Sequence, residues 1–118
     1  MGRVEFLEHG LHRILRLDYS GLAPQEFLAA WKKAARIIAM EPLGSVRLLT
    51  IPPLPLDERM ADAIRRGAPE KAKHVLAEAL VGATAFHRIL FLSNKAKYRL
   101  DREVFNDELQ AKEWLVSR

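Results

Sequence analysis

Hydrophobic and polar residues alternate through the first twenty positions of the chain. Val4 to Glu8 alternates with a period of two, and Leu11 to Tyr19 resumes the same extended pattern after the turn signal His9-Gly10. A period of two is typical of strands that bury one face, and a glycine between two such runs indicates a tight connection. The pattern therefore predicts two antiparallel strands that form a hairpin.

The period then changes to that of a helix. Pro24 suits the first turn of a helix, and Pro42 and Gly44 indicate where this helix has ended. Lysine and arginine cover the side opposite the apolar stripe. The stripe consists of residues three or four positions apart, namely Phe27, Leu28, Trp31, Ala34, Ala35 and Ile38.

A short apolar run, Val46 to Ile51, follows and is rich in residues that favour strands. Three prolines in Pro52 to Leu56 end the strand abruptly, because proline offers no N–H to a sheet. Asp57 then suits the N-cap of a new helix. A buried strand, a stiff segment and a helix start in this order are typical of the carboxyl edge of an α/β sheet, where such folds bind ligands.

We expect a helix from Asp57 to Arg66, with Gly67 after its last residue and Pro69 as a break. The segment from Lys71 to Leu80 is ambiguous, because its residue types favour a helix while its apolar positions alternate. We interpret His74 to Val81 as a strand, because an alternation of strands and helices requires one here.

The remaining pattern predicts a helix from Ala83 to about Tyr98, a short strand from Arg102 to Phe105, and a last helix from Asp107 to Val116 capped by Asn106. Trp114 shares the apolar side of the last helix, so we expect it to be buried against the sheet. The expected fold class is α/β, with a mixed sheet of about five strands and about four helices in a single domain spanning residues 1–118.

Composition narrows the class of protein further. The chain has 118 residues, 49% of them hydrophobic, which suits one core, and its net charge of +4 is not concentrated in a tail. Cysteine is absent, which excludes disulfides and thiolate metal sites. No apolar run approaches the ~20 residues of a membrane helix, and the first residues become acidic too soon for a signal peptide. We therefore expect a cytoplasmic protein without membrane insertion.

Three segments in this order resemble the SpoIIAA-like, or STAS-like, family of small bacterial domains: Leu17 to Leu22, Gly44 to Thr50, and Val104 to Leu115. The resemblance implies the same α/β fold. Anti-sigma-factor antagonists of that superfamily carry a phosphorylatable serine after the central strand, but no hydroxyl stands between Ile51 and Asp57 here. The resemblance thus implies a regulatory or ligand-sensing module that is not switched by phosphorylation at that position.

The carboxyl edge of the sheet is our candidate site, and it would also gather Asp18, Tyr19 and Ser20. At Thr84 two interpretations are open. The N–H groups of the helix start could bind an anion there, or Thr84 could simply cap the helix. Two leucines of the proline segment either return to the core or contact a partner. The residues predicted to bind a partner or ligand are Thr50, Pro52, Pro53, Leu54, Pro55, Leu56, Asp57, Thr84 and His87.

Other chemistry receives little support from the sequence. Ser20, His87 and Asp57 could be imagined as a triad, but no nucleophile elbow is present. The four histidines lack metal-ligand spacing on one helix face, and the basic residues accompany no nucleic-acid recognition motif. We therefore expect no catalytic residues, no metal, no cofactor and no nucleic acid.

Two functions follow from these patterns. The preferred one is a non-enzymatic regulatory or protein-interaction domain that binds a protein partner through Thr50 to Arg59. The alternative is a carrier of a small apolar or anionic ligand, bound between the proline segment and the helix that starts at Thr84. A closed core favours the first, and a cavity with converging polar groups favours the second. Whether the chain forms a homodimer stays open.

Overall fold

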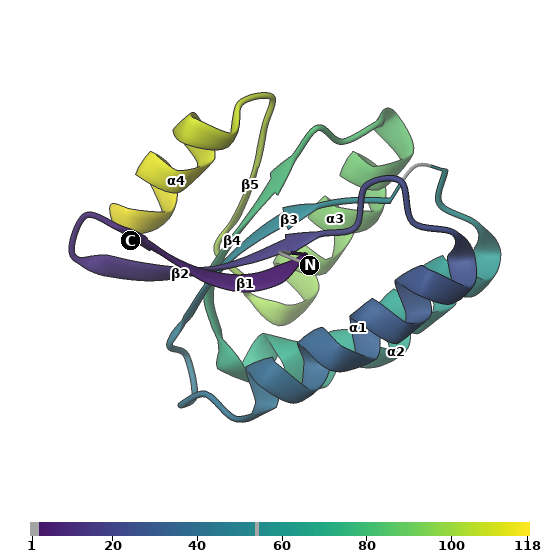
Figure 1. Ribbon diagram of the computed structural model, residues 1–118, viewed down its shortest axis with the longest axis horizontal. Helices are drawn as coiled ribbons and strands as arrows, with labels where there is room; N and C mark the ends of the chain where they lie inside the picture. The colour runs from purple at the N-terminus through teal and green to yellow at the C-terminus, as the bar shows by residue number, and fades with distance from the viewer. Residues whose placement is uncertain (1–2, 54) are drawn as a thin grey trace.

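The computed structural model describes residues 3–53 and 55–118, without the side chains of residues 85–87, 90, 94 and 96. A strand hairpin comes first, and helices then alternate with strands to the end of the chain (Figure 1). The elements are β1 (Val4–His9), β2 (His12–Asp18), α1 (Pro24–Ala39), β3 (Val46–Ile51), α2 (Glu58–His74), β4 (Val75–Val81), α3 (Ala85–Tyr98), β5 (Arg102–Phe105) and α4 (Glu108–Val116).

The five strands form one mixed sheet in the order β1-β2-β3-β4-β5. β1 is antiparallel to β2, and every later pair is parallel. Because strand order equals chain order, each crossover moves the same way across the sheet, and the right-handed rule then places α1, α2 and α3 on one face. Only α4 lies against the other face of the described sheet (Figure 1). The predicted fold class, an α/β mixed sheet of five strands with four helices, is confirmed.

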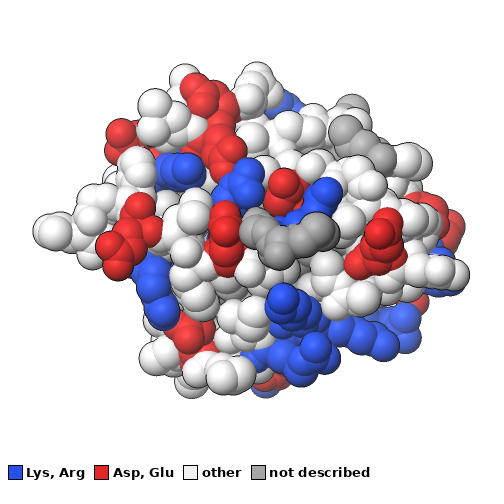
Figure 2. Space-filling view, in the orientation of Figure 1, with Lys and Arg blue, Asp and Glu red and all other residues white. Residues whose placement is uncertain are grey.

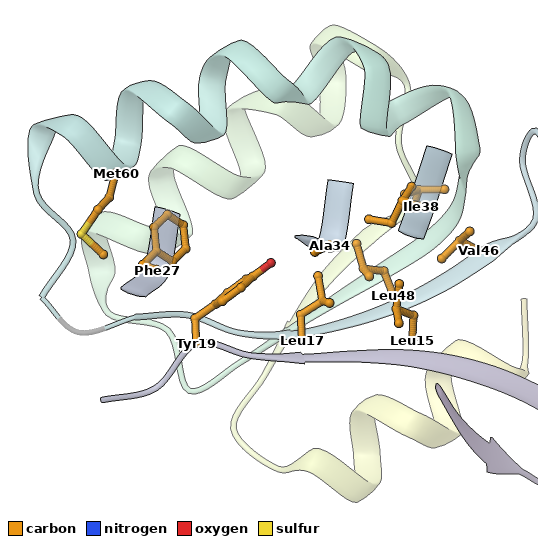
Figure 3. Packing of buried hydrophobic residues seen from close by; sticks show 10 residues of the cluster. Leu15, Leu17, Tyr19, Phe27, Ala34, Ile38, Val46, Leu48 and Met60 are labelled. Carbon is orange, nitrogen blue, oxygen red and sulfur yellow. The ribbon is translucent and has the colours of Figure 1, made fainter. Parts of the chain in front are cut away.

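The two faces of the sheet carry separate apolar clusters. The larger cluster joins β2 and β3 to α1 and α2, and Figure 3 shows its side chains filling the space between helices and strands. The smaller one joins alternate residues of β3 and β4 to α4, through Ala111 and Leu115. Alternation along each strand sends successive side chains to opposite clusters, which explains the period of two in the sequence.

The predicted end of the second helix at Arg66 is wrong, because α2 continues through Gly67 and Pro69 to His74. The packing of the helix outweighs the tendency of Gly67 and Pro69 to end it. Pro69 is on the exposed side of the helix, and Ala68 is buried beside it. Gly67 is a point of close approach, because a Cβ there would lie 3.2 Å from the Trp31 ring. The predicted strand is confirmed from Val75 onward, one residue later than expected.

Smaller differences occur near the C-terminus. Asp107 caps α4 in place of Asn106, since its carboxylate accepts a hydrogen bond of 2.8 Å from the Leu109 N–H. The expected burial of Trp114 is only partial: its ring packs on Phe105, whereas the neighbouring Leu115 is fully buried. The buried residues of α4 are Ala111 and Leu115, and Trp114 lies at the margin of this contact with the sheet.

We predict that Pro69→Ala raises the free energy of unfolding by about 2 kcal/mol, measured by urea denaturation. Proline inside a helix removes a hydrogen bond and crowds the preceding turn, while the freedom that alanine adds to the unfolded chain offsets part of the gain. Pro24→Ala is the matched control, because proline at the first helical position costs little. Equal effects of the two substitutions would contradict the prediction.

Candidate functional site

A cavity of about 60 Å³ lies between the sheet and helices α1, α2 and α3, next to the proline segment. A water molecule needs roughly 10–15 Å³ of such space, so the cavity can hold a few waters or a small organic group. Its walls are mostly apolar and include several polar side chains. The lining residues are Tyr19, Phe27, Trp31, Thr50, Pro52, Pro53, Leu56, Ile64, Lys71, Glu78, Leu80, Phe91 and Arg102.

Glu78, which is 1% exposed, is the centre of the polar part of the cavity. One carboxylate oxygen accepts hydrogen bonds from the Lys71 ammonium at 3.1 Å and from the Thr50 hydroxyl at 3.0 Å. The other oxygen accepts from the Arg102 guanidinium at 2.7 Å. We call these four residues the buried polar cluster.

The sheet register explains how the cluster forms. Glu78 of β4 lies level with Arg102 of β5, and Thr50 of β3 lies level with Leu80, two residues further along β4. Since side chains two apart on a strand share a face, Thr50, Glu78 and Arg102 all point toward α1, α2 and α3. Lys71 then reaches the same carboxylate from the last turn of α2.

The cluster changes the proton affinity of its members. Burial by itself opposes charge on Glu78, but the nearby Arg102 and Lys71 and the hydrogen bonds outweigh it, so the pKa of this carboxyl lies below its ordinary value. Burial lowers the pKa of Lys71, and Arg102 acts in the same direction, while Glu78 opposes them. The folded protein therefore holds a carboxylate between cationic groups, away from solvent.

Two polar atoms beside the cavity have no hydrogen-bond partner among the described residues, the Tyr19 hydroxyl and the Arg102 Nε. Figure 3 shows the Tyr19 hydroxyl directed from the end of β2 into the space between sheet and helices. Burial, and secondarily Glu78, raises the pKa of Tyr19, so its hydroxyl keeps its proton. Arg102 also donates to the Phe91 carbonyl at 2.9 Å, and its guanidinium lies 4.2 Å from the centre of the Phe91 ring.

The structure brings four of the predicted site residues to the cavity. Thr50, Pro52, Pro53 and Leu56 line it, and Thr50, which is 8% exposed, takes part in the buried polar cluster. Leu56 packs against the core, which is one of the two alternatives that the sequence left open for the leucines of the proline segment. Leu54 lies outside the described residues.

The other predicted site residues lie elsewhere or are not described. Pro55 is exposed, and Asp57 caps α2, accepting a hydrogen bond of 2.9 Å from the Met60 N–H. Thr84 is exposed just before α3, and its carbonyl accepts a hydrogen bond of 3.0 Å from the Arg88 N–H. The side chain of His87 lies outside the described part of the chain.

The other expected residues of this edge have structural partners. The Ser20 hydroxyl and N–H both donate to the Asp18 carboxylate, which also lies near Arg16. Ser20 is therefore bound to Asp18, and Asp57 caps α2, so both side chains have partners other than those of the imagined Ser20, His87 and Asp57 triad. Among the side chains that the structure describes, which exclude that of His87, no group of three could hold a metal ion.

Sequence reasoning missed the residues that make the site polar: Lys71, Glu78 and Arg102. The sequence did place Tyr19 at the carboxyl edge of the sheet, but Tyr19 was not among the predicted binding residues. Glu78 did carry a signal, because it is the single charged residue in the strand Val75–Val81. A carboxylate on the buried face of a strand needs a buried partner, and a search for that partner would have led to the site.

Basic side chains gather in the lower part of the view in Figure 2. On α1, Lys32, Lys33 and Arg36 are exposed. Acidic residues are spread over the rest of this face (Figure 2). The exposure of these lysines and arginines agrees with the solvated helix side that the sequence predicted. No helix within the described residues is long and apolar enough to cross a membrane.

The strand order and the helix arrangement define an α/β domain with a SpoIIAA-like fold. The chain is similar to an uncharacterized protein from the DUF3478 family with a SpoIIAA-like fold from Shewanella loihica PV-4. The TM-score is 0.76 at 12% identity, over 95% of this chain and 91% of that one. No family model and no curated protein matches the sequence. The fold implied by the sequence resemblance is thus confirmed.

Proposed function

We propose that the protein is a non-enzymatic binding module that takes a small molecule into the cavity beside the proline segment. The observation that carries the proposal is a cavity that combines apolar walls with a buried cluster of ionised side chains. Ligand sites commonly have this composition, with apolar surface for affinity and a few fixed polar groups for orientation.

The polar groups suit binding better than proton transfer. The Glu78 carboxylate accepts hydrogen bonds from three side chains, so it is held in its ionised form. A general base near neutral pH needs a pKa close to the working pH, and this pKa is shifted in the opposite direction. The same contacts hold the cluster rigid, which lowers the entropy lost when a ligand binds.

The described part of the proline segment supports the ligand-binding function. Pro52 and Pro53 are buried and Leu56 is half-buried, and all three face the cavity. They therefore close one side of the cavity. Binding of a protein through Thr50 to Arg59, and a regulatory role in the cytoplasm, stay predictions from the sequence.

We expect Ile64→Phe to weaken small-molecule binding at the cavity by about tenfold or more. Ile64 is half-buried on the cavity wall, so a larger ring there occupies space that a ligand needs. The measurement is a screen of small organic molecules followed by amide NMR, scored on Thr50, Glu78 and their neighbours. Ile89→Phe is the matched control, because Ile89 is 71% exposed on α3.

Equal binding by the two variants would contradict the cavity as the site. A library without any molecule that perturbs these amides in the unsubstituted protein would contradict the proposed function itself. Thermal unfolding of both variants shows whether lost binding reflects lost folding.

A further inference from the structure

The two unpartnered atoms beside the cavity, the Tyr19 hydroxyl and the Arg102 Nε, can both donate a hydrogen bond at neutral pH. The Arg102 Nε carries a hydrogen and has no acceptor lone pair to offer. The Tyr19 hydroxyl keeps its proton, because burial disfavours the phenolate. Tyr19 is 1% exposed and Arg102 is 4% exposed, so bulk solvent does not satisfy them. Two buried donors without acceptors indicate that a ligand acceptor completes the site.

The charge balance of the cavity points the same way. Of the described residues that line it, Lys71 and Arg102 are cationic and Glu78 is anionic. α1 contributes Phe27 and Trp31 to the lining, which add no charge. Because Lys71 donates to the Glu78 carboxylate at 3.1 Å as an ammonium, the lining has one positive charge in excess, and burying an unbalanced charge is costly. A ligand with a single negative charge would balance it.

Size and wall composition limit the rest of the ligand. A dry engineered cavity of ~150 Å³ holds benzene, so a cavity of about 60 Å³ accepts only a short hydrocarbon part. That part would pack against the aromatic and aliphatic wall, which includes Phe27, Trp31 and Leu80.

We propose that the cavity binds a short-chain monocarboxylate, with its carboxylate at the Tyr19 hydroxyl and the Arg102 Nε and its alkyl part against the apolar wall. The inference rests on the proposed function and names its ligand class. A carboxylate accepts hydrogen bonds from both donors, offsets the excess charge and leaves Glu78 bound to its own partners.

The test compares three probes of similar size, propionate, its near-isosteric amide propionamide, and propylammonium, each with sodium chloride added to equal ionic strength. Amide NMR titration gives their affinities, with Trp31 fluorescence in a Trp114→Phe background as a second readout. Trp31 lines the cavity, and Trp114 lies on the other face of the sheet beside Phe105. We expect propionate to bind about tenfold or more tightly than propionamide, and propylammonium to bind least, because hydrogen bonds to a charged acceptor are the stronger ones.

Tyr19→Phe is the diagnostic variant, because it removes the unpartnered hydroxyl and keeps the ring that packs on Phe27. We expect it to bind propionate about tenfold more weakly without any loss of thermal stability in the ligand-free protein. Tyr98→Phe, at the end of α3 and away from the cavity, is the matched control and should change neither. A structural hydroxyl would give the opposite result, with lower stability and unchanged affinity for propionate.

The outcomes separate the ligand class from the proposed function. Propionamide or propylammonium binding at the cavity as tightly as propionate would overturn the carboxylate class and leave a small-molecule site in place. Perturbation by propionate that sodium chloride reproduces would also overturn it. If none of the three probes perturbs the amides at the cavity, the ligand class is overturned. The separate small-molecule screen with Ile64→Phe then decides the proposed function.

Discussion

Glu78→Gln is expected to lower the free energy of unfolding by about 3–5 kcal/mol, measured by urea denaturation at neutral pH. The substitution keeps the shape of the side chain but leaves Lys71 and Arg102 without a buried counter-charge. Breaking a buried ion pair costs more than the pair contributes, because an uncompensated charge remains in the interior. Such a loss is a large share of the stability of an ordinary domain.

Glu108→Gln is the matched control for this prediction. Glu108 pairs with Arg16 on a partly exposed surface, where an ion pair contributes only about 0–1 kcal/mol. Similar losses for the two variants would show that the buried polar cluster has no special weight in the fold.

The same variant should show a distinct pH dependence. A carboxyl whose pKa is lower in the folded protein stabilises the fold fully above its ordinary value of 4.5, and this contribution is lost as pH falls through the folded pKa. The difference in stability between the natural protein and Glu78→Gln should therefore be largest near neutral pH and shrink below 4.5. A difference that grows on acidification would contradict the assigned charge of Glu78.

Leu115→Ala is expected to lower the free energy of unfolding by about 2–5 kcal/mol, because Leu115 is fully buried between α4 and the sheet and alanine would leave a cavity. Trp114→Ala should cost less, about 1–2 kcal/mol, although tryptophan is the larger side chain. Trp114 is only half-buried, so part of its ring is in water in the folded protein too. Chemical denaturation of both variants gives the order, and a larger loss for Trp114→Ala would contradict the structure.

Most elements of the fold could be predicted because the sequence marks them locally. Alternating residues define the hairpin, and the prolines after Ile51 mark the end of the central strand. The length of α2 could not be predicted this way. By sequence alone, Gly67 and Pro69 are helix breakers, yet the folded structure accommodates both. Gly67 leaves room for the Trp31 ring to pack closely, and Pro69 lies on the exposed side of the helix. Only the packing of α2 on α1 reveals these reasons.

The location of the candidate site could be predicted from the sequence, but the charged residues in it could not. The carboxyl edge of the sheet and the proline segment follow from sequence order, and Thr50, Pro52 and Pro53 do line the cavity. The partners of Glu78 depend on the pairing of β4 with β5 and on the extra turns of α2 that carry Lys71. Neither can be read from local pattern, so the charged part of the site remained hidden.

The agreement of strand order with chain order has a consequence for folding during synthesis. Each strand leaves the ribosome after the neighbour to which it binds, so the sheet can grow one strand at a time with short loops to close. Glu78 emerges 24 residues before Arg102, and until β5 arrives its carboxylate has Lys71 as its cationic partner in the cluster. A nascent chain that stops before β5 would expose the edge of β4 and an incompletely paired charge, which are features of a chain that cellular quality control removes.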